Sequence, residues 1–295
     1  MSKTTSKVLI VLAFIAIYFI WGSTYMLNKI AVKELPPLML SSFRFTTASI
    51  LIFIIAKFMN LSLSITRKQL LNSAIVGFLF LVYGNGVFVW ALKYLDSGFA
   101  ALLAASQPLF VLLLMRIMDK KRMKLKSIIG VVLGFVGMYL LVCQKELSFN
   151  EESAIGVIMV LTCVLGWSYA SIYVSKANLP SSYFISTAYQ MLTAGIMLAC
   201  FSLLLNEIWV FPIYWSVETK WSIVLLIVFG GIVAFTAFNY LLKNVSPEKV
   251  ATSAYVNPII ALFLGWYILD ENLTMQSIFS AIILLTGVYF ITSKK

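Results

Sequence analysis

The sequence contains no histidine and little charge, with Asp, Glu, Lys and Arg making up 11% of its 295 residues. Soluble domains usually carry about 25%. Without histidine, zinc-protease motifs and Ser-His-Asp triads are excluded. The sequence also has no G-x-x-x-x-G-K-[ST] phosphate loop, which excludes an ATP-driven pump acting alone. Because the three cysteines all lie in apolar stretches, we expect no disulfide framework and no metal site. The lack of histidine and of paired carboxylates within the apolar runs argues against an enzyme, and no cofactor is expected.

Apolar residues, by contrast, make up 61% of the chain. About 20 of them in a row cross a bilayer as a helix, which satisfies its own backbone hydrogen bonds. The apolar runs predict an all-α integral membrane protein of ten transmembrane helices. Their expected ranges are 8–28, 38–56, 71–91, 98–117, 127–143, 154–174, 184–205, 221–241, 249–268 and 276–292.

The charges are distributed unevenly between the loops on the two sides of these predicted helices. Of the 22 Lys and Arg residues, sixteen fall on the side of the termini and five on the other, while nine of the eleven acidic residues lie opposite the termini. Cytoplasmic loops carry the excess of Lys and Arg. We therefore expect cytoplasmic N and C termini in a multi-pass protein of the inner (cytoplasmic) membrane. The net charge of +11 then needs no nucleic acid partner.

The two halves of the chain resemble each other, so we expect five-helix repeats over 8–143 and 154–292 within one compact membrane domain. Trp21 matches Trp167 at an offset of 146, and Pro108 matches Pro258 at an offset of 150. Because five is odd, the second repeat should cross the membrane in the opposite direction. Inverted repeats of this kind are frequent in secondary transporters, whose substrate sites lie near the midplane.

Loop charge supports that inversion. The predicted fourth helix is followed by the basic residues 120–122, whereas the predicted ninth helix is followed by Asp270, Glu271 and Asn272. Equivalent loops of opposite charge are expected when they face opposite sides of the membrane.

Amides, aromatic residues and prolines within the apolar runs are the candidates for a central substrate cavity. Pro108 and Pro258 each follow an amide and each remove one helical hydrogen bond at mid-helix, which exposes a carbonyl. Ordinary kinks, an interfacial aromatic belt or hydrogen bonds between helices are alternative explanations. The candidate substrate-binding residues are Trp21, Tyr25, Asn28, Arg44, Tyr83, Asn85, Gln107, Pro108, Trp167, Tyr173, Asn239, Tyr255, Asn257 and Pro258.

Arg44 is the only charged residue well inside a predicted span, and the second half carries Gln190 at the equivalent position. A charge at that depth is costly and usually functional, although an arginine near a helix end can also extend to the interface. If Arg44 faces the cavity, it favours a substrate that bears a carboxylate. No Asp or Glu lies mid-span, so a carboxylate proton relay is not expected.

Small residues recur at Gly130, Gly134 and Gly137 in the predicted fifth helix. This spacing is typical of closely packed helices. It predicts a scaffold contact within the chain or a homodimer contact, so both a monomer and a homodimer remain possible.

The segment from Trp21 to Lys29, together with Arg44, the two prolines and the Asp270–Glu271 turn, resembles the EamA-type transporters of the drug/metabolite transporter superfamily. That resemblance implies ten helices, alternating access and a cavity lined by helices one, three and four with six, eight and nine. Relatives of this kind move amino acids, drugs and nucleotide sugars. We therefore expect a secondary transporter of small metabolites, exporting amino acids or related compounds, with a lipid-handling protein, a membrane-embedded enzyme or a channel as alternatives.

Overall fold

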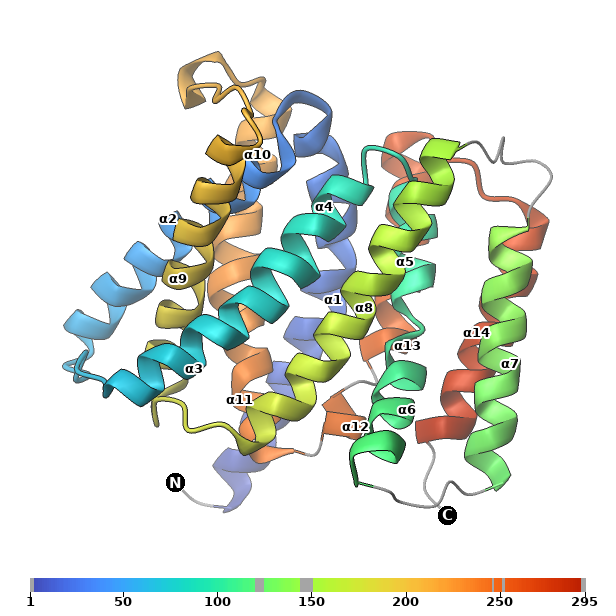
Figure 1. The fold of residues 1–295 in the computed structure, drawn as a ribbon, viewed down its shortest axis with the longest axis horizontal. Helices are drawn as coiled ribbons and strands as arrows, with labels where there is room; N and C mark the ends of the chain where they lie inside the picture. The colour runs from blue at the N-terminus through green and yellow to red at the C-terminus, as the bar shows by residue number, and fades with distance from the viewer. Residues whose placement is uncertain (1–2, 120–124, 144–150, 246, 251–252, 293–295) are drawn as a thin grey trace.

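The computed structural model describes residues 3–119, 125–143, 151–245, 247–250 and 253–292, and every element within these ranges is a helix (Figure 1). The first half comprises α1 (Lys3–Glu34), α2 (Pro37–Phe58), α3 (Arg67–Gly77), η1 (Phe78–Val87), α4 (Phe88–Ala91), α5 (Ser97–Ala104), α6 (Gln107–Asp119) and α7 (Leu125–Val142). The second half comprises α8 (Glu151–Lys176), α9 (Tyr183–Leu204), η2 (Pro212–Tyr214), α10 (Val217–Leu225), η3 (Leu226–Phe235), α11 (Thr236–Asn244), α12 (Pro247–Val250), α13 (Ser253–Leu269) and α14 (Met275–Thr292).

Eight helical stretches within the described ranges are long and apolar enough to cross a bilayer, and Val256–Leu269 and Met275–Phe290 are shorter apolar helices. The chain is therefore an all-helical, multi-pass membrane protein. The expected count of ten crossings, with its inverted repeat, stays a prediction.

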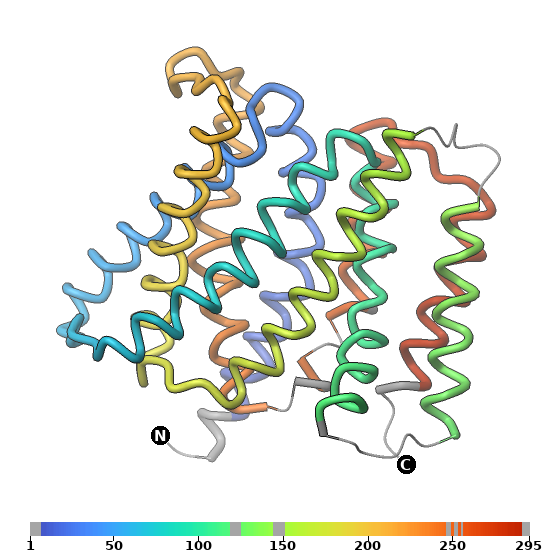
Figure 2. The backbone as a smooth tube through the Cα atoms, viewed as in Figure 1, coloured from blue at the N-terminus to red at the C-terminus, as the bar shows by residue number. Residues whose placement is uncertain are grey.

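The helices pair across the two halves of the chain. α2 packs on α9, α7 packs on α14, and α1 contacts α13 near the centre (Figure 1). The tube in Figure 2 shows that α1 begins and α14 ends at the lower edge. It also shows that α6 ends at the lower edge and α13 at the upper edge, so these two helices run in opposite directions in this view.

The ends of α2 and α9 share one local structure that the sequence analysis did not anticipate. Asn60 and Asn206 both have a positive φ, 54° and 55°, and asparagine tolerates this region better than most residues. In both places the next N–H bonds back to the helix, Leu61 to the Ala56 carbonyl at 2.9 Å and Glu207 to that of Ser202 at 3.0 Å. These hydrogen bonds close the last turn as in a Schellman motif.

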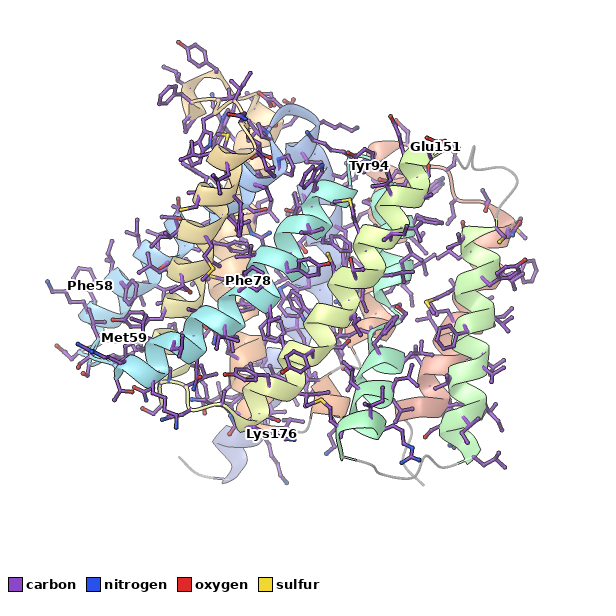
Figure 3. The ribbon with its side chains drawn as sticks, in the orientation of Figure 1. Phe58, Met59, Phe78, Tyr94, Glu151 and Lys176 are labelled. Carbon is purple, nitrogen blue, oxygen red and sulfur yellow. The ribbon has the colours of Figure 1, made fainter. Side chains whose placement is uncertain are left out.

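The outer surface of the bundle is apolar. Phe58 and Met59 project from the end of α2, away from the other helices (Figure 3), and are 83% and 51% exposed. Large hydrophobic side chains are similarly exposed along α7 and α14. In water such a surface would drive aggregation, whereas in a bilayer it contacts the acyl chains.

Two ten-residue stretches, η1 and η3, have π-helical hydrogen bonding. They interrupt the third membrane-spanning stretch, Arg67–Ala91, and the eighth, Val217–Asn244. Most π-helices are single-turn bulges and are frequent at functional sites. The two stretches begin 148 residues apart, between the offsets of 146 and 150 that relate the two halves.

Candidate functional site

A cavity of about 110 Å³ lies between the two halves, and residues of both halves line it. One water needs roughly 10–15 Å³ in this measure, so the space suits several waters or a small organic molecule. Nine of the fourteen candidate residues line it, namely Trp21, Tyr25, Asn28, Arg44, Asn85, Gln107, Trp167, Asn257 and Pro258.

Arg44 lies at the polar end of this cavity and does not extend to the membrane interface. It is 3% exposed, and its Nη1 donates to the side-chain oxygens of Asn28 at 3.3 Å and Asn85 at 3.4 Å. Asn28 is itself oriented by a 2.8 Å bond from its nitrogen to the Thr24 carbonyl. The Arg44 Nε is buried without a hydrogen-bond partner. Two amide groups therefore hold the guanidinium while leaving it donors to spare.

The rest of the cavity wall is aromatic. We use "aromatic cluster" for Trp21, Phe80, Trp167, Phe235 and Phe238. The Trp21 ring lies 4.8 Å from Phe238 and 5.8 Å, edge to face, from Trp167, and all but the fully buried Phe80 line the cavity. Such ring pairs stabilise one another beyond their buried area, so the cluster is a stiff apolar surface.

The glycines of the π-helical stretches allow other groups to approach the cavity closely. A Cβ at Gly84 of η1 would lie 2.9 Å from the Trp167 ring. A Cβ at Gly230 of η3 would lie 3.0 Å from Nη2 of Arg44. In addition, the Trp21 indole donates to the Gly230 carbonyl at 3.4 Å. Glycine at these two positions leaves room for the tryptophan and the guanidinium.

The two prolines have different effects on their helices. Near Pro108 the helix is interrupted as predicted, because α5 ends at Ala104 and α6 begins at Gln107. The hydroxyl of Ser106 in the break donates to the Leu103 carbonyl at 2.6 Å. Pro108 itself is buried but is not among the cavity-lining residues.

At Pro258, by contrast, the helix is not interrupted, because α13 continues through the proline, which fits the alternative of an ordinary kink. The residue equivalent to Ser106 is Val256, whose side chain has no hydroxyl to satisfy exposed backbone. The Asn257 amide instead donates to the α1 carbonyls of Ile17 at 3.2 Å and Tyr18 at 2.8 Å. This contact holds α13 against α1.

Three further candidates lie away from the cavity, where they join helices. Tyr83 packs its ring against Gly166 of α8, and the Tyr173 hydroxyl donates to Asn72 at 3.0 Å. Asn239 donates to Thr187 at 3.0 Å and belongs to a buried amide network with Gln190. These three fit the alternative of hydrogen bonds and packing between helices. The side chain of Tyr255 lies outside the described part of the structure.

The sequence analysis missed Phe235 and Phe238, which complete the aromatic wall. Phenylalanine within an apolar run looks the same whether it faces lipid, protein or a cavity. The only available signal was their place four and seven residues after Gly231, on the same helix face, because the paired glycines 230 and 231 mark an irregular helix.

At the upper edge of the bundle, acidic side chains of one half cap helices of the other. Glu271 accepts hydrogen bonds at the start of α5 from the N–H groups of Ser97 at 2.7 Å and Gly98 at 3.0 Å, and from the Ser97 hydroxyl at 2.9 Å. Burial and this nearby carboxylate raise the pKa of Asp96, against the opposing influence of Lys29 and Lys33. The Lys29 ammonium also donates to the carbonyls of Leu92 and Leu95, between α4 and α5, at 2.7 Å each.

Two other glutamates repeat this arrangement. Glu207 accepts from the N–H of Met39 at the start of α2 at 2.8 Å. Glu34 accepts from the N–H and hydroxyl of Ser216, before α10, at 3.0 Å and 2.7 Å. Carboxylates are favoured at helix N-termini because the unpaired N–H groups and the helix dipole attract negative charge. We call these three contacts the glutamate caps, and they fasten the halves together at the upper edge.

The predicted stripe of Gly130, Gly134 and Gly137 packs against other helices of the same chain. A Cβ at Gly137 would lie 2.7 Å from the backbone of Leu284 on α14, and one at Gly134 would meet Leu109 at 2.5 Å. The stripe is thus a scaffold contact, and the oligomeric state stays a prediction. No cluster of three or more His, Cys, Asp or Glu side chains able to hold a metal occurs among the described residues.

Comparison with known proteins gives consistent matches along the chain. The EamA-like transporter family matches residues 8–143 and 154–293. The uncharacterized inner membrane transporter YedA of Escherichia coli strain K12 is 34% identical over 291 residues, covering 96% of this chain and 92% of that protein. The uncharacterized transporter YoaV of Bacillus subtilis strain 168 is 24% identical, covering 96% of each. A solved structure titled "Crystal structure of protein" has a TM-score of 0.70 at 17% identity, covering 95% of this chain and 94% of that one, and shares its fold.

Proposed function

The chain belongs to the EamA-like transporter family, and from this premise we propose that it is a secondary transporter that exports small metabolites, amino acids or related compounds, by alternating access. Its central cavity is the proposed substrate site, and the cytoplasmic membrane is its proposed location. Transport, not catalysis, is the proposed activity.

The observation that carries the proposal is the central cavity itself. It has a cationic, amide-rich end at Arg44 and an aromatic wall around Trp21 and Trp167, and both halves of the chain contribute to it. Sites for small molecules are mostly apolar with a few well-placed polar groups, and in transporters they lie between repeats near the midplane.

The arrangement of the two halves supports alternating access. The π-helical stretches η1 and η3 border the cavity from corresponding places in the halves. The glutamate caps fasten the halves at the upper edge, and a separate contact, from the Asn72 amide to the Asn178 carbonyl at 2.9 Å, joins the halves away from them. In the proposed cycle these caps separate when the cavity opens at the upper edge, and they form again when it opens at the lower edge.

Export is tested by filling the cavity. Ala104 lines it at the end of α5, so Ala104→Trp should occupy much of its volume. Val132→Trp is the matched control, because Val132 lies on the outer face of α7 and is 56% exposed. Metabolites in the spent medium are compared between cells that overproduce each variant and cells with an empty vector.

We expect compounds that accumulate with the original chain and with Val132→Trp but not with Ala104→Trp, at equal amounts of folded protein. The absence of any differential compound, or undiminished export by Ala104→Trp, would refute the proposed role of the cavity.

A further inference from the structure

The guanidinium of Arg44 has hydrogen-bond donors that the described protein does not use. Of its five N–H donors, only those of Nη1 have hydrogen-bond partners among the described residues, Asn28 and Asn85, at the long distances of 3.3 and 3.4 Å. Nε is fully buried and unpartnered. No carboxylate from the described residues pairs with it, although a buried cation normally has such a partner.

We infer that the cargo carries a carboxylate that binds between the Arg44 guanidinium and the Asn85 amide, with its apolar body against the aromatic cluster. The inference rests on the proposed transport function and assigns its substrate class. The Nη2 donors of the guanidinium and the Asn85 amide nitrogen can each bind one oxygen of a carboxylate, and a hydrogen bond between two charged groups is a strong one. The cargo then supplies the negative charge that the protein leaves out.

Asn85 is positioned to contribute a further donor. Its side-chain oxygen accepts from Arg44, which turns its nitrogen away from the guanidinium, and that nitrogen has no hydrogen-bond partner among the described residues. Asn85 is half-buried and lines the cavity. The unused groups of Arg44 and Asn85 are thus all donors, which favours an anionic group beside them.

The second half of the chain provides an internal comparison. Gln190 stands at the position equivalent to Arg44, and its amide exchanges hydrogen bonds with Asn239, with 3.4 Å in each direction. Gln190 also donates to Ser186 at 2.9 Å. This neutral pair is buried and lies away from the cavity. The fold therefore accepts a neutral amide at this position of the second half. Of the two equivalent residues, only Arg44, which faces the cavity, carries a charge.

The remainder of the cavity determines what the rest of the cargo molecule should be like in polarity and size. Trp21, Trp167 and Phe238 present ring faces and edges to it, so the part of the molecule away from the carboxylate should be apolar. A volume of about 110 Å³ limits it to a small molecule. An amino acid with an apolar side chain or a short organic acid meets these conditions.

Arg44→Gln tests the inference, because it installs the residue that the second half already accommodates. Arg67→Gln is the matched control, since Arg67 is exposed at the start of α3. Arg44→Lys keeps the charge but loses the planar pair of donors. Spent-medium metabolites are compared between each overproducing strain and the empty vector, with folding checked by gel filtration and circular dichroism.

We expect the compounds exported by the original chain to carry a carboxylate and an apolar group. Their export should fall at least tenfold with Arg44→Gln, less with Arg44→Lys and not with Arg67→Gln. Exported compounds without a carboxylate, or undiminished export by folded Arg44→Gln, would overturn the inference while leaving transport intact. If the original chain exports nothing, the proposed function fails and the inference with it. Even if both Arg44 variants misfold, the class of compound exported by the original chain shows whether the cargo carries a carboxylate.

Discussion

Replacing Glu271 should weaken the contact between the loop after α13 and the start of α5. Its carboxylate accepts three hydrogen bonds of 2.7–3.0 Å from Ser97 and Gly98. Glu271→Ala removes all three and leaves the first N–H groups of α5 to water. Glu271→Gln keeps an acceptor but loses the charge, so the two variants separate hydrogen bonding from electrostatics.

The magnitude follows from comparable capping contacts. Loss of a helix cap costs about 0.5–2 kcal/mol, and a charge near a helix N-terminus contributes about 0.3–1 kcal/mol. Glu271 is only half-buried, so water compensates for part of the loss. We therefore expect about 2 kcal/mol for Glu271→Ala and about 1 kcal/mol for Glu271→Gln. The larger value is roughly a 30-fold change in the unfolding equilibrium.

The assay is reversible unfolding in mixed micelles with increasing dodecyl sulfate, followed by circular dichroism. Glu218→Ala is the control, because Glu218 also lies in the first turn of a helix, α10, but is exposed. It should change the free energy of unfolding by less than about 1 kcal/mol. If Glu271→Ala is no more destabilising than Glu218→Ala, the capping contact does not stabilise the fold as reasoned.

Two further outcomes are expected. Because the pKa of Asp96 is raised by burial and Glu271, its ionisation disfavours the folded state, and this cost grows as pH rises through the folded pKa. The Asp96→Asn variant should therefore melt at a higher temperature than the original chain at pH 7, and the difference in melting temperature should close as pH falls towards the ordinary pKa of aspartate. A difference independent of pH would contradict the argument. In a cysteine-free background, a membrane-impermeant thiol reagent added to intact cells should label Asn272→Cys but not Lys126→Cys until the cells are opened, and labelling of both from outside would refute the inverted arrangement.

Much of the site could be predicted because polar residues are conspicuous within an apolar sequence. Asn28, Arg44, Asn85 and Trp167 all line the cavity, and each was a candidate because lipid is a poor environment for its polar atoms. The same reasoning selected Asn239 and Tyr173, whose partners are other helices. Polarity at depth indicates that a side chain faces inward, but it does not distinguish a cavity from a neighbouring helix.

The unpredicted features depend on partners that are distant in sequence. Phe235 and Phe238 join the cavity wall because Trp21 and Trp167 pack on them, and no local pattern encodes that contact. The equivalent prolines lie in one interrupted and one continuous helix, and their surroundings differ, with Ser106 in the first half and Val256 at the equivalent position in the second. An α-helix and a π-helix also have similar apolar composition, so η1 and η3 were read simply as parts of spans.

The π-helical stretches have a consequence for changes in chain length. An α-helix turns by about 100° per residue, and a π-helix accommodates extra residues in its turns. Deleting one residue within η1 would remove an extra residue from these turns, so the stretch returns towards α-helical bonding and the chain on either side, Phe88 included, can keep its direction. The turn itself changes, which moves Asn85 relative to Arg44 while hydropathy and span length stay almost the same. A single-residue deletion there should thus alter the site while the protein still inserts, so relatives with a gap at this point would need a different set of cargo contacts.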